Sequence, residues 1–127
     1  MDKKRSYNEE INLEFVYTDI FDSIWNHYNL TEEDKKNFEK QIRDYEENNT
    51  NPNNILGDII PDTGGAIKLR FNSLTDNVGK SGSYRIIYCK YGRRVYAMIL
   101  IYKKSDKETL TGKEKKIIKD RIKKLKK

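Results

Sequence analysis

The sequence predicts a single α+β domain that covers residues 1–127, and three observations lead to this fold class. Three strand-like runs follow one another between Gly64 and Lys104. Two segments before them repeat apolar residues at the 3.6-residue period of an amphipathic helix. The chain then ends in one lysine-rich helical segment. A chain of 127 residues is long enough for one hydrophobic core but not for two.

The N-terminal part is predicted to form one strand and two helices. Residues 11–17 largely alternate apolar and polar side chains, which is typical of a strand. Residues 19–28 place apolar residues at the spacing of a helix that buries one face. Thr31 and Asp34 have the spacing of a capping box, so a second helix is expected to begin there and to continue to about Glu47.

The central part is predicted to form a loop, a turn and three strands. In chain order these segments are 48–54, 57–65, 66–72, 83–91 and 94–104. The turn is glycine-flanked, but it matches no phosphate-binding loop and leads into a strand. In the first of the three strands, apolar residues alternate with Lys68 and Arg70, which places two cations on the face opposite the core.

The last helix is strongly basic. Thr111 and Glu114 predict its start by capping-box spacing. Four aliphatic residues form a narrow stripe along it: Ile117, Ile118, Ile122 and Leu125. Nine Lys or Arg residues cover the remainder: 113, 115, 116, 119, 121, 123, 124, 126 and 127.

Charge is divided unequally along the chain. Residues 1–65 hold 7 Lys or Arg and 15 Asp or Glu, whereas residues 66–127 hold 19 and 5. A positive surface from the second half suits a polyanion such as RNA or DNA. The alternative is a lysine bias that only keeps the chain in solution, but such a bias does not explain the asymmetry.

Several classes of protein are disfavoured by the composition. Cys89 is the only cysteine, so no internal disulfide is possible and a reducing, cytoplasmic location is expected. The N-terminus lacks the apolar region of a signal peptide, and the longest apolar run, from Val95 to Tyr102, is too short to span a membrane. His27 lies off the apolar stripe of its helix and is expected to be solvated. One His and one Cys, far apart, predict no metal site and no cofactor.

Three motifs occur in a characteristic order. They are Gly57…Ile60-Pro61…Thr63-Gly64-Gly65…Lys68-Leu69-Arg70, then Gly79-Lys80-Ser81-Gly82-Ser83-Tyr84-Arg85-Ile86-Ile87-Tyr88, then Ile101-Tyr102-Lys103-Lys104-Ser105-Asp106-Lys107-Glu108-Thr109-Leu110-Thr111. Together they resemble the RelE/HigB family of bacterial toxins. These toxins belong to type II toxin–antitoxin modules in the RelE/ParE superfamily. The strongest resemblance spans about half of the chain.

The resemblance implies a small, twisted, mainly antiparallel sheet of about four strands, with the two N-terminal helices packed on one face. It implies a ribosome-dependent endoribonuclease, an mRNA interferase that cleaves mRNA in the ribosomal A site and inhibits translation. It also implies a cognate antitoxin, often a helix-turn-helix repressor. The expected partners are therefore the antitoxin, the ribosome and mRNA, with no membrane and no small-molecule cofactor. The basic last helix is expected to bind ribosomal RNA.

Residue by residue, the resemblance assigns two groups of site residues. The catalytic residues are predicted to be Lys68, Arg70, Arg85 and Lys104. The residues predicted to contact RNA are Lys80, Tyr84, Tyr102 and Lys103. The chain departs from the family pattern at Asp62, where the family often has Gly, and at Ile67, where it has a basic residue. It also lacks the aromatic residue or histidine that some RelE members carry after the position of Tyr102.

Such cleavage needs no metal ion, because the 2′-OH of RNA attacks the adjacent phosphorus itself. The protein must take the 2′ proton, protonate the 5′ leaving oxygen and stabilise the negative phosphorane. Crowded cations favour a neutral lysine that can act as a base, and arginine suits bidentate phosphate contact. The predicted roles are general base (Lys68 or Lys104), phosphate clamps (Arg70 and Arg85), positioning contact (Lys80) and auxiliary group (Tyr102).

Three other interpretations stay open at this point. The first is a ParE-like inhibitor of DNA gyrase, which needs no catalytic cluster. The second is a protein that binds nucleic acid without catalysis, as a degraded toxin would. The third is that individual cations are solvated charges at strand ends.

Overall fold

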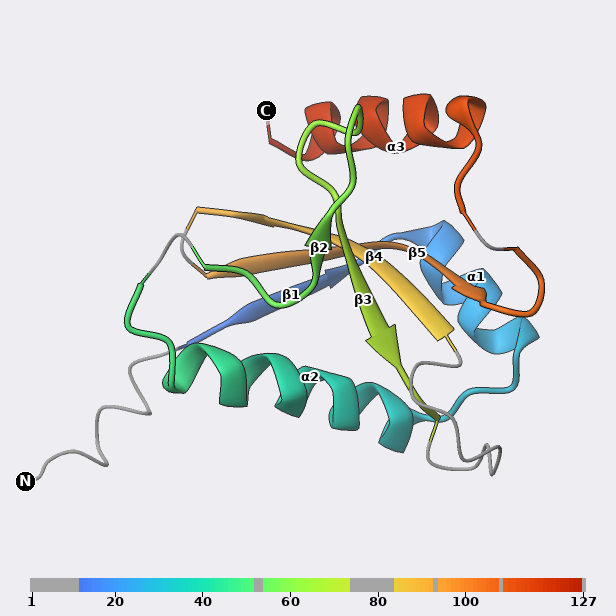
Figure 1. The fold of residues 1–127 in the computed structure, drawn as a ribbon. Coiled ribbons are helices and arrows are strands. Elements are labelled where there is room, and N and C mark those ends of the chain that lie inside the picture. Colours follow the sequence, from blue (N-terminus) through green and yellow to red (C-terminus); the bar gives the residue numbers. More distant parts are fainter. Residues whose placement is uncertain (1–11, 52–53, 74–83, 93, 108, 127) are drawn as a thin grey trace, which may run out of the picture.

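The computed structural model describes residues 12–51, 54–73, 84–92, 94–107 and 109–126. Eight elements follow one another in these ranges (Figure 1). They are β1 (Glu14–Tyr17), α1 (Asp19–His27), α2 (Glu32–Glu47), β2 (Asp58–Ile59), β3 (Ile67–Phe71), β4 (Tyr84–Tyr91), β5 (Val95–Lys103) and α3 (Gly112–Leu125). None of the helices described is both long and apolar enough to cross a membrane.

The strands form one mixed sheet in the order β1-β5-β4-β3-β2. β1 pairs with β5 in parallel, and the other three neighbouring pairs are antiparallel. The α+β class is confirmed, but the prediction of about four strands was wrong because the sheet has five. The additional strand, β2, has two residues inside the segment predicted as a turn, and two residues are too few to show an alternating pattern.

The two N-terminal helices share an aromatic core against one face of the sheet. Phe21 and Trp25 of α1 lie beside Phe38 of α2, with ring centroids 5.6–6.4 Å apart. Phe71 of β3 stacks on Trp25 at 6.1 Å. Ile67, on the same strand, is buried in this cluster, which confirms that it faces the core.

The opposite face of the sheet is covered by α3 (Figure 1). Ile118 and Ile122 of α3 are buried against Ile87, Cys89 and Ala97 of the two central strands. The prediction placed the two N-terminal helices on one face and gave the basic C-terminal helix no face, so the layer that α3 forms on the other face is a difference from it. The reason is that β4 and β5 carry apolar residues on both faces, and each face must be removed from water. Cys89 is buried, as predicted, and burial raises the pKa of its thiol.

Both predicted capping boxes are present. The Thr31 hydroxyl accepts from the Asp34 N–H at 3.1 Å, and the Asp34 carboxylate accepts from the Thr31 N–H at 3.0 Å. Thr111 and Glu114 make the same reciprocal pair at 3.1 and 2.9 Å. Each pair satisfies two N–H groups that have no partner within the helix. The first strand is shorter than predicted, since its ladder begins at Glu14.

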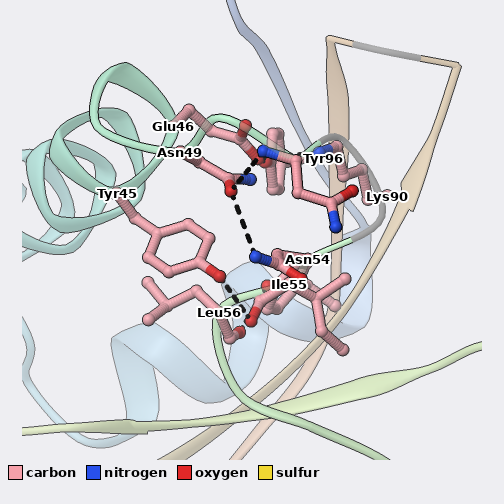
Figure 2. A network of polar contacts seen from close by, with 10 residues as sticks. Tyr45, Glu46, Asn49, Asn54, Ile55, Leu56, Lys90 and Tyr96 are labelled. Carbon is pink, nitrogen blue, oxygen red and sulfur yellow. Dashed lines mark hydrogen bonds and ion pairs between the residues drawn. The ribbon is translucent and has the colours of Figure 1, made fainter.

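A polar network fixes the segment that leads from α2 to the sheet (Figure 2). The Tyr45 hydroxyl donates to the Ile55 carbonyl at 3.0 Å. The Glu46 carboxylate accepts from Lys90 Nζ at 2.7 Å and from the Tyr96 hydroxyl. The end of α2 is thereby tied both to β4 and β5 and to the segment before β2.

The segment from Gly57 to Ala66, which carries β2 and leads into β3, is compact and depends on small side chains. Gly57 has φ +116°, and a Cβ there would lie 2.4 Å from the Lys68 carbonyl oxygen, so only glycine lets the chain pass so close to β3. The buried Thr63 hydroxyl donates to the Ile60 carbonyl at 2.7 Å and accepts from the Ala66 N–H at 3.0 Å. This turn brings Asp58 directly opposite Lys68 in the β2–β3 ladder.

Candidate active site

A row of polar residues crosses the face of the sheet that α3 covers. Arg70 of β3 lies opposite Arg85 of β4, which lies opposite Tyr102 of β5. Lys68 is two residues before Arg70 and therefore lies on the same face. Like charges directly opposite each other destabilise a sheet, so the Arg70–Arg85 pair is not explained by stability. It suits a surface that binds an anion.

The cations of the row differ in exposure. Arg70 is exposed, Lys68 is half-buried, and Arg85 is only 8% exposed. The Arg85 guanidinium donates to the Tyr84 carbonyl at 3.3 Å. Within the described ranges, neither Lys68 nor Arg70 forms an ion pair with a carboxylate. Both are thus available to an external anion.

A cavity of about 180 Å³ lies beside this row, between β2, β3, β5 and the first turn of α3. Five polar side chains line it: Asp58, Lys68, Tyr102, Thr109 and Lys115. Apolar residues, among them Ile60 and Leu110, complete the wall. A carboxylate, a phenol and two cations thus open onto a single space, which is the set of groups that acid–base chemistry on a phosphodiester requires.

Tyr102 is the most constrained of these groups, because it is only 4% exposed. Burial raises the pKa of its hydroxyl above the ordinary value of 10.0; the Arg85 charge opposes this shift and Glu114 adds to it. Lys107 Nζ lies 5.6 Å from the centre of the Tyr102 ring and forms an ion pair with Glu114. That bond lowers the pKa of the Glu114 carboxyl. The phenol therefore keeps its proton at neutral pH and has one to donate, although the raised pKa makes it a weaker acid.

The other predicted residues that the structure describes lie elsewhere. The Tyr84 ring is buried on the opposite face of the sheet, where it packs against Tyr28 and Phe71. Lys103 Nζ lies 5.8 and 5.9 Å from the Tyr28 and Tyr84 rings, on that same face. Lys104 is exposed in the turn after β5 and does not line the cavity. Lys80 lies outside the described residues. The structure thus brings together four of the eight predicted residues: Lys68, Arg70, Arg85 and Tyr102.

Sequence analysis missed two charged residues that line the cavity, Asp58 and Lys115. A signal for Lys115 existed, since it lies three residues before Ile118 and seven before Ile122 and hence on the buried side of α3. No comparable signal existed for Asp58, because the two-residue strand that carries it was not predictable from the pattern.

No protein-family model matches the chain, and no curated protein gives a significant match to it. In the described part of the chain, no three His, Cys, Asp or Glu side chains are grouped so as to hold a metal ion. The fold and the site define an α+β protein with a cationic row that borders a small cavity.

Proposed function

We propose that this protein is the toxin of a type II toxin–antitoxin module and acts as a metal-independent mRNA interferase. It would cleave mRNA in the ribosomal A site, in the cytoplasm, and would be neutralised by a cognate antitoxin. The observation that carries the proposal is the convergence of Lys68, Tyr102 and Lys115 on one cavity beside the Arg70–Arg85 pair. The resemblance to RelE/HigB toxins supplies the target, which the geometry alone does not specify.

The charges of the row fit the needs of the transition state. When the 2′-OH attacks, the phosphorus gains a fifth oxygen and an additional negative charge. Arg70 and Arg85 lie across adjacent strands and can both donate to phosphate oxygens, and guanidinium groups do so in a bidentate manner. Preorganised donors of this kind typically account for a factor of about 10²–10³ each in rate.

The cavity holds an acid and two candidates for the base. Tyr102 can protonate the 5′ leaving oxygen, because its phenol is neutral at neutral pH. Lys68 can take the 2′ proton through its amine nitrogen. Asp58 can take it through a carboxylate oxygen, which is an acceptor. In this proposal Lys104 has no role as base, since it does not line the cavity.

Primer extension on an mRNA in a reconstituted translation reaction tests the proposal, with ribosomes present or omitted. We expect cuts only when ribosomes are present. Lys68→Ala should lower the cleavage rate by about 10²-fold or more. Lys36→Ala is the control, because Lys36 is an exposed lysine on α2, on the far side of the sheet. Its rate should be that of the unmodified protein.

The same assay distinguishes the two candidate bases, and together with a supercoiling assay it distinguishes the competing functions. If Asp58→Asn abolishes cleavage and Lys68→Ala only weakens it, the carboxylate is the base and the lysine stabilises charge. No cleavage with or without ribosomes would contradict the nuclease. Inhibition of DNA supercoiling by gyrase would then favour the ParE-like alternative.

A further inference from the structure

A second and larger groove, of about 540 Å³, adjoins the cavity. It runs along α3 and is lined by Asp62, Gly112, Lys115, Lys116, Lys119, Asp120 and Lys123. Lys115 lines both spaces and so forms their common wall. An RNA strand that leaves the cavity past Lys115 would therefore enter this groove directly.

The groove is built by a fixed loop that faces the helix (Figure 1). The loop is closed by the buried Thr63, whose hydroxyl bonds to the backbone on both sides. Asp62 and Gly64 have φ +65° and +77°, and a Cβ on Gly64 would lie 3.5 Å from Lys119 Cγ. The left-handed conformation at Asp62 explains why glycine suits this position in the family that the motifs resemble.

Charge in the groove is predominantly positive. Four lysines line it, against two carboxylates, Asp62 and Asp120. In the described part of the chain none of the four lysines forms an ion pair. Lys119 and Lys123 are four residues apart, so their ammonium groups follow one side of the helix. The groove thus offers a line of unneutralised point charges, which suits phosphate groups spaced along a strand.

We propose that this groove binds the phosphodiester backbone of single-stranded RNA and continues the path of the strand that is cleaved in the cavity. One side of α3 would then hold the substrate itself, whereas the helix as a whole was expected to bind ribosomal RNA. The strand is single because the substrate of the proposed function is mRNA. The inference rests on the proposed function, since it takes the cavity as the place of cleavage.

The test is fluorescence anisotropy of the full chain with a 2′-O-methyl RNA 12-mer, measured without ribosomes at several salt concentrations. Methylation blocks the attacking 2′-OH, so only binding is observed. The double variant Lys119→Gln/Lys123→Gln removes two charges from the groove. The double variant Lys113→Gln/Lys124→Gln removes two charges from exposed positions of α3 that do not line it. The two proteins have equal net charge.

We expect the groove variant to bind about tenfold more weakly or worse, and the slope of log Kd against log salt to fall by about 1.4, or 0.7 for each lost phosphate contact. The control variant should lose about twofold or less. Asp120→Asn should tighten binding by about twofold, because it removes a negative charge from the groove. A polyglutamate peptide of equal charge should not displace the RNA.

Equal losses in the two double variants would overturn the inference, since α3 would then act as a uniform cationic surface. Displacement by polyglutamate would overturn it in favour of an acidic protein segment. If the protein cleaves mRNA only with ribosomes present, but RNA binding does not depend on the groove lysines, the groove proposal is refuted and the nuclease proposal is not. If RNA binding depends on the groove lysines but no cleavage occurs, the nuclease proposal is refuted and RNA binding by the groove is kept.

Discussion

At the scale of single residues, Tyr102 decides whether the site performs acid catalysis. Tyr102→Phe removes the hydroxyl and keeps the ring between Arg85 and Lys107. We expect single-turnover cleavage to slow by about 10²–10³-fold while the melting temperature stays within about 2 °C, because the packing is unchanged. Tyr91→Phe is the matched control, since Tyr91 packs in the same cluster beneath α3 and does not line the cavity. If both variants cleave equally well, Tyr102 is not the acid.

The pKa of Tyr102 also gives the site a characteristic pH dependence. Burial raises this pKa above 10.0, so the phenol stays protonated throughout the neutral and mildly alkaline range. The single-turnover rate should therefore not decline between pH 7 and 9.5. A decline within that interval would assign the proton donor to a group with a lower pKa.

Which face a side chain occupies could be predicted on β3 but not on β5. On β3 the alternation is uninterrupted, so the sequence placed Lys68 and Arg70 opposite the core correctly. On β5 the register shifts where Ile87 and Tyr88 pair with Leu100 and Met98. The irregularity reverses the alternation beyond it, so that Tyr102 faces the cavity and Lys103 the aromatic core. Alternation counted from the start of the strand would instead place Tyr102 on the side of the aromatic core and Lys103 on the side of the cavity.

At the scale of elements, the close approach of the two-residue strand β2 to β3 depends on the glycine that precedes it, Gly57. Gly57→Ala would place a Cβ 2.4 Å from a backbone oxygen of β3, and no side chain can move to relieve this contact. We expect a loss of about 2 kcal/mol or more in the free energy of unfolding, measured by urea denaturation. Cleavage should also fall, because Asp58 and Lys68 lose their register.

Gly92→Ala is the control for that substitution. Gly92 has φ +65°, but a Cβ there meets no atom within 4 Å. The expected loss is only the conformational cost of about 1 kcal/mol, with cleavage unchanged. Equal losses in the free energy of unfolding for the two variants would show that the close approach of Gly57 to β3 adds nothing to the cost of Gly57→Ala.

Elements were predictable where local chemistry determines them. The starts of α2 and α3 followed from Thr31 and Thr111, because a capping box acts over only three residues. The position of α3 over the second face was not predictable, since it depends on the burial of residues far away in the sequence. The same holds for the cavity, whose walls come from residues 58 to 115.

At the scale of the whole molecule, two buried tyrosines and one half-buried tyrosine make stability sensitive to alkali. Burial raises the pKa of Tyr17, Tyr88 and Tyr96 well above the ordinary value of 10.0. Glu39 and Glu46 add to the shifts of Tyr17 and Tyr96 through hydrogen bonds and charge. Below pH 10 these tyrosines are protonated in both states, and stability does not depend on them.

Above pH 10 the unfolded chain loses protons that the folded protein retains, so the free energy of unfolding should fall as pH rises. Each such tyrosine adds up to about 1.4 kcal/mol per pH unit to the slope. Urea denaturation between pH 8 and 11 measures this, and Tyr96→Phe should make the decline shallower. An equal slope in that variant would mean that Tyr96 ionises in the folded state.

Because β1 pairs in parallel with β5, the sheet can become complete only late in the synthesis of the chain. Glu14 pairs with Val95, so the strand that is made first has no neighbour until the last strand exists. Pairings between such distant segments form late, because the intervening loop must first be closed. Lys115, which closes the cavity, leaves the ribosome later still. If the protein cuts mRNA, the active cavity cannot exist before the ribosome has synthesised all five strands and the first turn of α3.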